Sequence, residues 1–279
     1  MKTVIHKPIS VLSIAGFDGS GGAGIQADTK TISAHGCYAT NVLTALPIQN
    51  TTGVKNIYEL PANAIREQIK SILDDIYPDA IKIGMVHSIE LVEIIADELK
   101  HYNGPIVFDP VMVSTSGHQL IKDDTILACI ENLFPIATII TPNLNEASIL
   151  VNETINTTEL MLIAGEKILN LNCKNVLIKG GHLEQKELIS YLFQQNKSTV
   201  TFTSTKIITK NTHGSGCTLS SAIASNLAIG HPLTESVKLA QEYVEQAIYG
   251  SKDLIIGKGN GPLNHLFNPQ KLKTNEIYN

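Results

Sequence analysis

Residues 80–113, "AIKIGMVHSIELVEIIADELKHYNGPIVFDPVMV", contain the pattern that decides the fold. Two nearly continuous apolar runs, 80–86 and 105–113, flank a stretch, 89–102, in which apolar residues recur at helical spacing. A helix between two short apolar strands is the unit that joins neighbouring parallel strands. Because such strands are buried on both sides, the stretch predicts a parallel sheet covered by helices on both faces.

The same alternation extends along the chain. Further strand-like runs occupy 9–16, 39–46, 137–141 and 175–181, and further helical patterns occupy 61–77 and 122–134. Two consecutive β-like runs, 187–194 and 198–209, predict an antiparallel hairpin at the sheet edge. The sequence shows no linker, low-complexity tract or internal repeat, so we expect residues 1–279 to form a single α/β domain.

Composition narrows the class of partner. The 279 residues are 43% hydrophobic with a formal net charge of −5, and no basic tract favours nucleic acid or a membrane surface. No apolar run reaches the roughly 18 to 20 residues that span a bilayer, and the N-terminal apolar run reads as a strand. Four scattered cysteines without C-x-x-C disfavour zinc and disulfides. We expect a cytoplasmic protein that binds a small molecule.

Ligands of parallel sheets bind beyond the carboxyl ends of the strands, where several polar residues fall. Asp109 follows a buried run and requires a cation or hydrogen-bond donors. Asn143 and Glu146 lie three apart at a helix start, which fits either a capping box or one ligand-binding face. Asp109 and Glu146 together suit a hydrated Mg²⁺. Lys179 ends another strand, and its side chain either binds a phosphate or is solvated.

Gln49 and a glycine-rich loop follow the first two strands. Gln49 ends an apolar strand. Its side chain either caps the strand end or pairs through its amide with an aminopyrimidine. The loop 16–24 satisfies G-x-G-x-x-G, but no Asp or Glu lies between Asp28 and Glu59 to bind a ribose, which disfavours a dinucleotide. Ile25 stands where a P-loop requires lysine. The glycines therefore form a tight turn or let a ring-shaped substrate approach the backbone.

The segment "NTHGSGC" (211–217) precedes a helix of small residues and predicts an anion-binding turn, because free N–H groups and the helix dipole favour negative charge there. The turn ends in Cys217. We expect this position to lower the thiol pKa from about 8.5 toward neutrality. Cys217 is then a candidate general base, with a buried structural cysteine as the alternative.

Taken in order, the segments "GSGGAGIQAD", "ALPIQNT", "KIGM", "FDPVM", "TPNLNEA", "IKGGH" and "NTHGSGC" closely resemble the bacterial hydroxymethylpyrimidine/phosphomethylpyrimidine kinases of thiamine synthesis. The similarity extends from about Val11 to 257–262. It implies a ribokinase-like three-layer α/β/α sandwich with a mostly parallel sheet and an antiparallel edge. It also implies that ATP and Mg²⁺ serve to phosphorylate 4-amino-5-hydroxymethyl-2-methylpyrimidine and then its monophosphate. We further expect a homodimer.

The resemblance assigns roles by motif. The pyrimidine pocket falls on Gly16, Asp28, Gln49, Met85, Val111 and Cys217. Metal binding falls on Asp109 and Glu146, and nucleotide binding on Asn143, Lys179 and Thr212. The catalytic set is Cys217 with the anion hole of Gly214, Ser215 and Gly216, and in most ribokinase-like kinases an aspartate replaces the cysteine. The chain departs from the family pattern at Phe17-Asp18-Gly19 and at Ser114-Thr115, the latter in a loop over the substrate.

Three alternatives remain. Pyridoxal kinases of the same fold resemble this chain, but that group has a non-amide residue in place of Gln49 and a second cysteine after the "DPVM" stretch, where this chain has "STSGH" (114–118). A dinucleotide-dependent oxidoreductase lacks its ribose-binding acid here. A non-catalytic pyrimidine-binding protein would not require Asp109, Glu146 and the anion turn.

Overall fold

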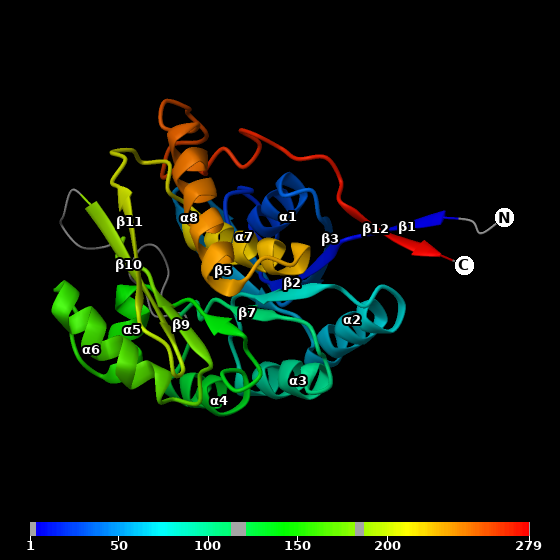
Figure 1. Ribbon diagram of the computed structural model, residues 1–279, viewed down its shortest axis with the longest axis horizontal. Coiled ribbons are helices and arrows are strands. Elements are labelled where there is room, and N and C mark those ends of the chain that lie inside the picture. Colours follow the sequence, from blue (N-terminus) through cyan, green and yellow to red (C-terminus); the bar gives the residue numbers. More distant parts are fainter. Residues whose placement is uncertain (1–3, 113–120, 182–186, 279) are drawn as a thin grey trace.

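The computed structural model describes residues 4–112, 121–181 and 187–278 and is built on an eight-stranded sheet with strand order β11-β10-β9-β8-β7-β6-β2-β3 (Figure 1). The parallel strands are β2 (Ser10–Ala15), β3 (Tyr38–Leu43), β6 (Ala80–Ile83), β7 (Ile106–Phe108), β8 (Ile139–Ile140) and β9 (Asn175–Ile178). The antiparallel edge consists of β10 (Glu187–Gln194) and β11 (Val200–Thr205). The predicted parallel sheet and edge hairpin are both confirmed.

Helices cover both faces of the sheet (Figure 1). One layer consists of α1 (Gly24–Ala34), α7 (Ser215–Ile229) and α8 (Leu233–Tyr249), which pack on one apolar cluster. The other consists of α2 (Ala62–Asp75), α3 (Ile89–Leu99), α4 (Asp123–Asn132), α5 (Leu144–Val151) and α6 (Thr158–Leu169), which pack on a second cluster. The helices predicted over 61–77, 89–102 and 122–134 form with slightly shorter bounds, and the α/β/α sandwich is confirmed.

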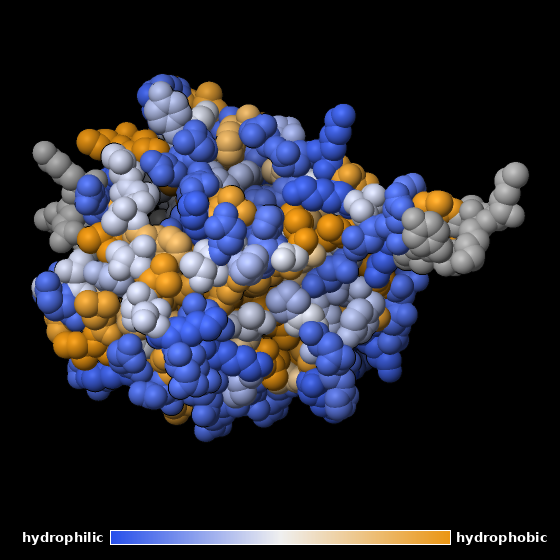
Figure 2. All heavy atoms as spheres, in the orientation of Figure 1, coloured by the Kyte–Doolittle hydropathy of each residue, from blue (hydrophilic) through white to orange (hydrophobic). Residues whose placement is uncertain are grey.

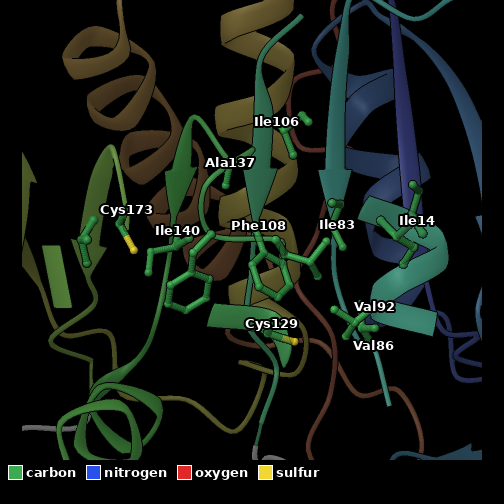
Figure 3. Close-up of a cluster of buried hydrophobic side chains, with 14 of the residues drawn as sticks. Ile14, Ile83, Val86, Val92, Ile106, Phe108, Cys129, Ala137, Ile140 and Cys173 are labelled. Carbon is green, nitrogen blue, oxygen red and sulfur yellow. The ribbon is translucent and has the colours of Figure 1, made fainter. Parts of the chain in front are cut away.

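The larger apolar cluster is centred on the middle strands (Figure 3). Phe108 of β7 lies between its strand neighbours Ile83 and Ile140, and its ring meets Phe134 edge-on at a centroid distance of 6.0 Å. All of these side chains are buried. This packing fixes the ends of the central strands, from which the polar residues singled out above extend.

A buried ion pair lies on the opposite face of the same strands. Lys82 of β6 bonds Asp28 of α1 at 2.8 Å, and both side chains are 0% exposed. Asp28 also accepts hydrogen bonds from Ser13 of β2 (2.6 Å) and Ser221 of α7 (2.8 Å). Burial alone would lower the pKa of Lys82, but its negative neighbours, led by Asp28 and including Asp109, together outweigh burial and the pKa is raised. Through this pair and the two serines, β6, α1, β2 and α7 are joined.

Two small sheets lie outside the central one. The strand β1 (Val4–Pro8) pairs with β12 (Thr274–Tyr278), and β4 (Ala45–Asn50) forms a hairpin with β5 (Gly53–Glu59). The expectation of one strand over 39–46 is therefore wrong, whereas Gln49 does lie next to a strand end, that of β4. The sheet strand ends at Leu43, and Gln49 lies in the separate hairpin beside a bulge between Ile48 and Gln49. Pro47, which lacks an N–H, is tolerated in this hairpin because each strand has a free edge.

The surface is polar without a single dominant apolar area in the view of Figure 2, where hydrophobic residues are scattered among hydrophilic ones. Among the residues that the structure describes, no helix has both the length and the apolar character to cross a membrane.

The Lys82–Asp28 pair provides a stability test. We expect Lys82→Met to lower the free energy of unfolding by about 3–5 kcal/mol, because it leaves a buried carboxylate without its counter-charge. The double variant Lys82→Met/Asp28→Asn should lose less, since it leaves no unpaired charge. Urea denaturation followed by circular dichroism measures both. A single variant at least as stable as the double variant would contradict this account.

Candidate active site

Loops from separate parts of the chain meet at the carboxyl edge of the sheet. The glycine loop, residues 16–24, follows β2, and the anion turn, residues 211–217, leads into α7. Asp109 and Lys179 follow β7 and β9. Because parallel strands share a carboxyl edge, residues distant in sequence are brought to one site, as the sequence pattern predicts.

The anion turn has the geometry that an anion site requires. The helix α7 begins at Ser215, so the N–H groups of Gly216 and Cys217 lie in its first turn, where no preceding helical carbonyl pairs with them. Gly214 has φ +82°, and a Cβ there would overlap the carbonyl oxygen of Gly22. Only glycine permits this close approach, so the anion turn and the glycine loop are in direct contact.

Asp18 and His213 connect the same two loops. Asp18 is buried and accepts hydrogen bonds from the N–H groups of Ser20, Gly22 and Ala23 and from His213 Nε2 at 2.9 Å. Burial raises the pKa of Asp18, but these hydrogen bonds, led by that of His213, hold it well below its usual range. The sequence interpretation assigned neither residue a role, although both stand in the motifs that it quoted.

Lys179 and Asp109 form an ion pair under the anion turn. Their Nζ–Oδ1 distance is 2.9 Å, and Asp109 also accepts a hydrogen bond from Thr141 at 3.0 Å. A Cβ on Gly216 would lie 3.4 Å from Lys179 Nζ and 3.6 Å from Asp109 Oδ2. The Lys179 side chain is only 15% exposed, so its interpretation as a solvated lysine is wrong. Burial lowers the pKa of Lys179, but the charges of Asp109 and Glu146 outweigh it and the pKa is raised.

Glu146 serves as a capping residue, as one of the two interpretations predicted. Asn143 Oδ1 accepts from the Glu146 N–H at 3.0 Å, and Glu146 Oε2 accepts from the Asn143 N–H at 2.8 Å. Burial raises the pKa of Glu146 to about 7, the Asp109 charge adds to this, and Lys179 opposes it. An added cation would favour the ionised form.

The residues present fit a magnesium ion that keeps most of its water. Mg²⁺ binds through one or two carboxylates and substrate phosphates. Asp109 is buried beside the anion turn, and Glu146 is buried close enough to Asp109 and Lys179 for their charges to act on it, so these two carboxylates would suit such an ion. In the described part of the chain, no group of three or more His, Cys, Asp and Glu side chains forms a metal site of protein ligands alone.

The residues assigned to the pyrimidine pocket are only partly gathered. A Cβ on Gly16 would lie 3.2 Å from Met85 Cε and 3.9 Å from Pro47 Cγ, so the glycine loop, the end of β6 and the β4–β5 hairpin meet. Gln49, on that hairpin, is half-buried. Val111 is half-buried after Asp109. Asp28 lies beneath, with both carboxylate oxygens bonded inside the protein. The departure at Ser114-Thr115 and the segment 114–118 lie outside the described residues.

Cys217 differs from expectation in its pKa. The residue is half-buried, and its sulfur accepts a hydrogen bond from the N–H of Gly24, at the start of α1. Burial nevertheless raises its pKa to about 11, Lys82 opposes the rise, and the charges of Asp28 and Asp109 add to it. The predicted lowering toward neutrality is therefore wrong, because desolvation and two nearby carboxylates outweigh the helix dipole. The thiol is protonated near pH 7.

Residues 18–264 match the family model described as phosphomethylpyrimidine kinase. The chain belongs to this family. A hydroxymethylpyrimidine/phosphomethylpyrimidine kinase of Rhizobium meliloti (strain 1021) is 44% identical over 255 residues, which are 91% of this chain and 96% of the relative. The chain spans about half the length of longer relatives: it covers 47% of a probable thiamine biosynthetic bifunctional enzyme of Oryza sativa subsp. japonica, at 43% identity over 92% of this chain.

Solved structures agree with this family. The crystal structure of phosphomethylpyrimidine kinase from Clostridium difficile 630 has a TM-score of 0.76 and 44% identity, covering 86% of this chain and 99% of that one. An ADP complex of Bacillus subtilis pyridoxal kinase has a TM-score of 0.85 and 34% identity, covering 92% and 97%. The expected ribokinase-like fold and kinase family are confirmed.

His265 supports the start of α7 and supplies a pH test. Its Nε2 lies 3.0 Å from Thr218 Oγ1, one residue after Cys217, and burial lowers its pKa from 6.5 to about 4. Between these values the unfolded chain binds a proton that the folded protein does not. The contribution of His265 to stability should therefore fall by about 3 kcal/mol as the pH drops from 7.5 to 4. Urea denaturation should show a shallower pH dependence for His265→Gln, and equal slopes would contradict the assignment.

Proposed function

We propose that this chain uses Mg-ATP to phosphorylate 4-amino-5-hydroxymethyl-2-methylpyrimidine to the monophosphate and then to the diphosphate, in thiamine synthesis. One observation carries the proposal. The first turn of α7 lies within 4 Å of both Lys179 and Asp109, measured from a Cβ built on Gly216. An N–H turn, a buried ammonium group and a buried carboxylate are therefore combined at one point. This combination suits phosphoryl transfer, in which catalysis consists mainly of positioning and charge stabilisation.

On the phosphate side, the chain supplies fixed positive charge and N–H donors. The anion hole of Gly214, Ser215 and Gly216 would receive the transferring phosphoryl group, with Lys179 beneath it. Thr212 and Asn143 would bind the nucleotide. Because the Asn143 side-chain oxygen already caps α5, Asn143 would bind through its backbone or through a second hydrogen bond of its side chain. Asp109 and Glu146 would hold Mg²⁺, whose charge offsets that of the ATP phosphates.

On the acceptor side, the β4–β5 hairpin supplies recognition. The Gln49 carboxamide would pair with the 4-amino group and the adjacent ring nitrogen, as amides pair with adenine. Gly16, Met85 and Val111 would contact the ring. Asp28 would support the pocket without binding the ring directly, because its carboxylate is already bonded to Lys82, Ser13 and Ser221.

We propose a second candidate activity, the phosphorylation of pyridoxal or pyridoxine. Its support is the likeness to solved pyridoxal kinases, including that of Staphylococcus aureus in complex with pyridoxal, with a TM-score of 0.84 and 30% identity over 96% of this chain. Gln49 disfavours it.

We also propose that residues 1–279 act as one domain in a cytoplasmic homodimer. The four cysteines, all free thiols, are consistent with a reducing compartment, and light scattering tests the oligomeric state.

The function is tested by following the products of purified protein with Mg-ATP and the pyrimidine alcohol. We expect monophosphate first and diphosphate later, because one anion turn serves both transfers. Gln49→Met is the matched variant. Its preference for the pyrimidine, measured as the ratio of kcat/KM for the pyrimidine to kcat/KM for pyridoxal, should decrease by an amount that corresponds to about 1–3 kcal/mol. A reaction that stops at the monophosphate under excess ATP would refute the second transfer, and an unchanged preference would remove Gln49 from recognition.

The role of Cys217 as general base is tested by its pH dependence. Because its pKa is raised to about 11, the thiolate fraction increases throughout pH 6 to 9. The wild-type kcat at saturating Mg-ATP should increase with pH, whereas Cys217→Ala should be flat and slower by roughly 10²–10⁴-fold at the upper end. Wild-type and variant rates that agree across this range would show that Cys217 only lines the pocket.

A further inference from the structure

The β4–β5 hairpin that carries Gln49 has little support of its own. Every residue of β5 is exposed, including Val54, Ile57 and Tyr58. Isolated two-stranded hairpins are at best marginally stable in water. At its base, the hairpin is attached to the glycine loop, where the Phe17 N–H donates to the Ala45 carbonyl at 3.0 Å. The Gln49 backbone also packs on this loop, since a Cβ on Gly19 would lie 3.7 Å from the Gln49 carbonyl oxygen. The direction of the Gln49 side chain, close to the tip, depends in addition on how the tip is held.

Thr51, at the tip, makes three hydrogen bonds to a distant loop. Its Oγ1 accepts from the N–H groups of Lys258 and Gly259, both at 3.2 Å, and its carbonyl accepts from the Asn260 N–H at 3.0 Å. The loop 257–260 is shaped around this residue. Gly257 has φ +73°, and a Cβ on Gly257 or Gly259 would overlap Thr51. Both positions therefore require glycine for the tip to dock.

The docking loop is itself fixed to the anion turn. The His213 N–H donates to the Gly261 carbonyl at 3.1 Å, and His213 pairs with Pro262 in a short parallel bridge. His213 also bonds Asp18 of the glycine loop. The platform that receives Thr51 is thus the one that holds the phosphate side of the site.

We propose that Thr51 is a positioning residue that docks the hairpin tip on loop 257–260 and thereby holds the Gln49 carboxamide over the acceptor side of the site. This inference rests on the proposed function, in which Gln49 binds the pyrimidine. Gln49 lies two residues from Thr51 and directly beside the bulge. A bulge bends the strand and redirects its side chains, so the direction of Gln49 is defined only when both ends of the hairpin are held.

The experiment compares Thr51→Val with Thr51→Ser and Thr52→Val. Among the residues that the structure describes, the neighbouring Thr52 hydroxyl bonds within the hairpin, to Asn50 Oδ1 at 2.6 Å, and not to the loop 257–260, which makes Thr52→Val a matched control. Thr51→Val should raise the KM for the pyrimidine alcohol about tenfold through loss of two hydrogen bonds, with the KM for ATP changed less than about twofold. Thr51→Ser and Thr52→Val should resemble wild type. An unchanged KM for the pyrimidine in Thr51→Val overturns the proposal.

Two further measurements separate this role from simple destabilisation. In the Gln49→Met background, Thr51→Val should have no further effect on acceptor KM, because it acts through Gln49, and additive effects overturn that role. Hydrogen exchange of the amides at 45–59 should be faster in Thr51→Val than in Thr52→Val. Equal exchange overturns the docking whether or not the pyrimidine is the substrate, so failure of the inference is distinguishable from failure of the proposed function.

Discussion

The buried ion pair between Lys82 and Asp28 is the interaction on which the site depends most. With Ser13 and Ser221 it connects β2, β6, α1 and α7. Gly16 follows β2, Met85 follows β6, and Cys217 lies one helical turn before Ser221. A parallel sheet brings strand ends to one edge, but their relative heights are set by contacts such as this one. The ion pair therefore fixes the relative positions of these strand ends and of the first turn of α7, around which the candidate site is formed.

Charge in the site is arranged as two ion pairs that affect one thiol. Lys82 pairs with Asp28, and Lys179 pairs with Asp109. The charges of Lys82, Asp28 and Asp109 all act on Cys217. Desolvation contributes most to the raised thiol pKa, Lys82 opposes it, and the two carboxylates add to it. In the proposed function, anion binding by the N–H groups and Lys179 would thus be separate from proton transfer at Cys217.

The sequence predicted the fold well because the signal is local. Apolar runs and helical spacing located the central strands, three helices of one layer and the edge hairpin of β10 and β11. The β4–β5 hairpin was missed because apolar residues lie on both sides of the true end of β3 at Leu43 with only Thr44 between them, although Pro47 signalled a break. The pairing of β1 with β12 joins distant segments and leaves no periodic signal.

The candidate site was predictable where a residue follows a strand, as Asp109 and Lys179 do. The roles of Lys82, Asp18 and His213 were not, because each depends on a partner from another part of the chain. A lysine within the apolar run "AIKIGMV" was the available signal for Lys82. The error on the Cys217 pKa has the same origin. The helix terminus is visible in the sequence, whereas burial and the neighbouring carboxylates are not.

The raised pKa values of the cysteines have a consequence for oxidative damage. Burial raises the pKa of Cys37 and Cys217 to about 11 and that of Cys129 and Cys173 to about 12. Oxidation by peroxide proceeds through the thiolate, which is then on the order of one molecule in ten thousand or fewer at neutral pH. A thiol at a helix N-terminus would ordinarily be the first to form a sulfenic acid. In this protein, Cys217 occupies that position while remaining a poor target for peroxide.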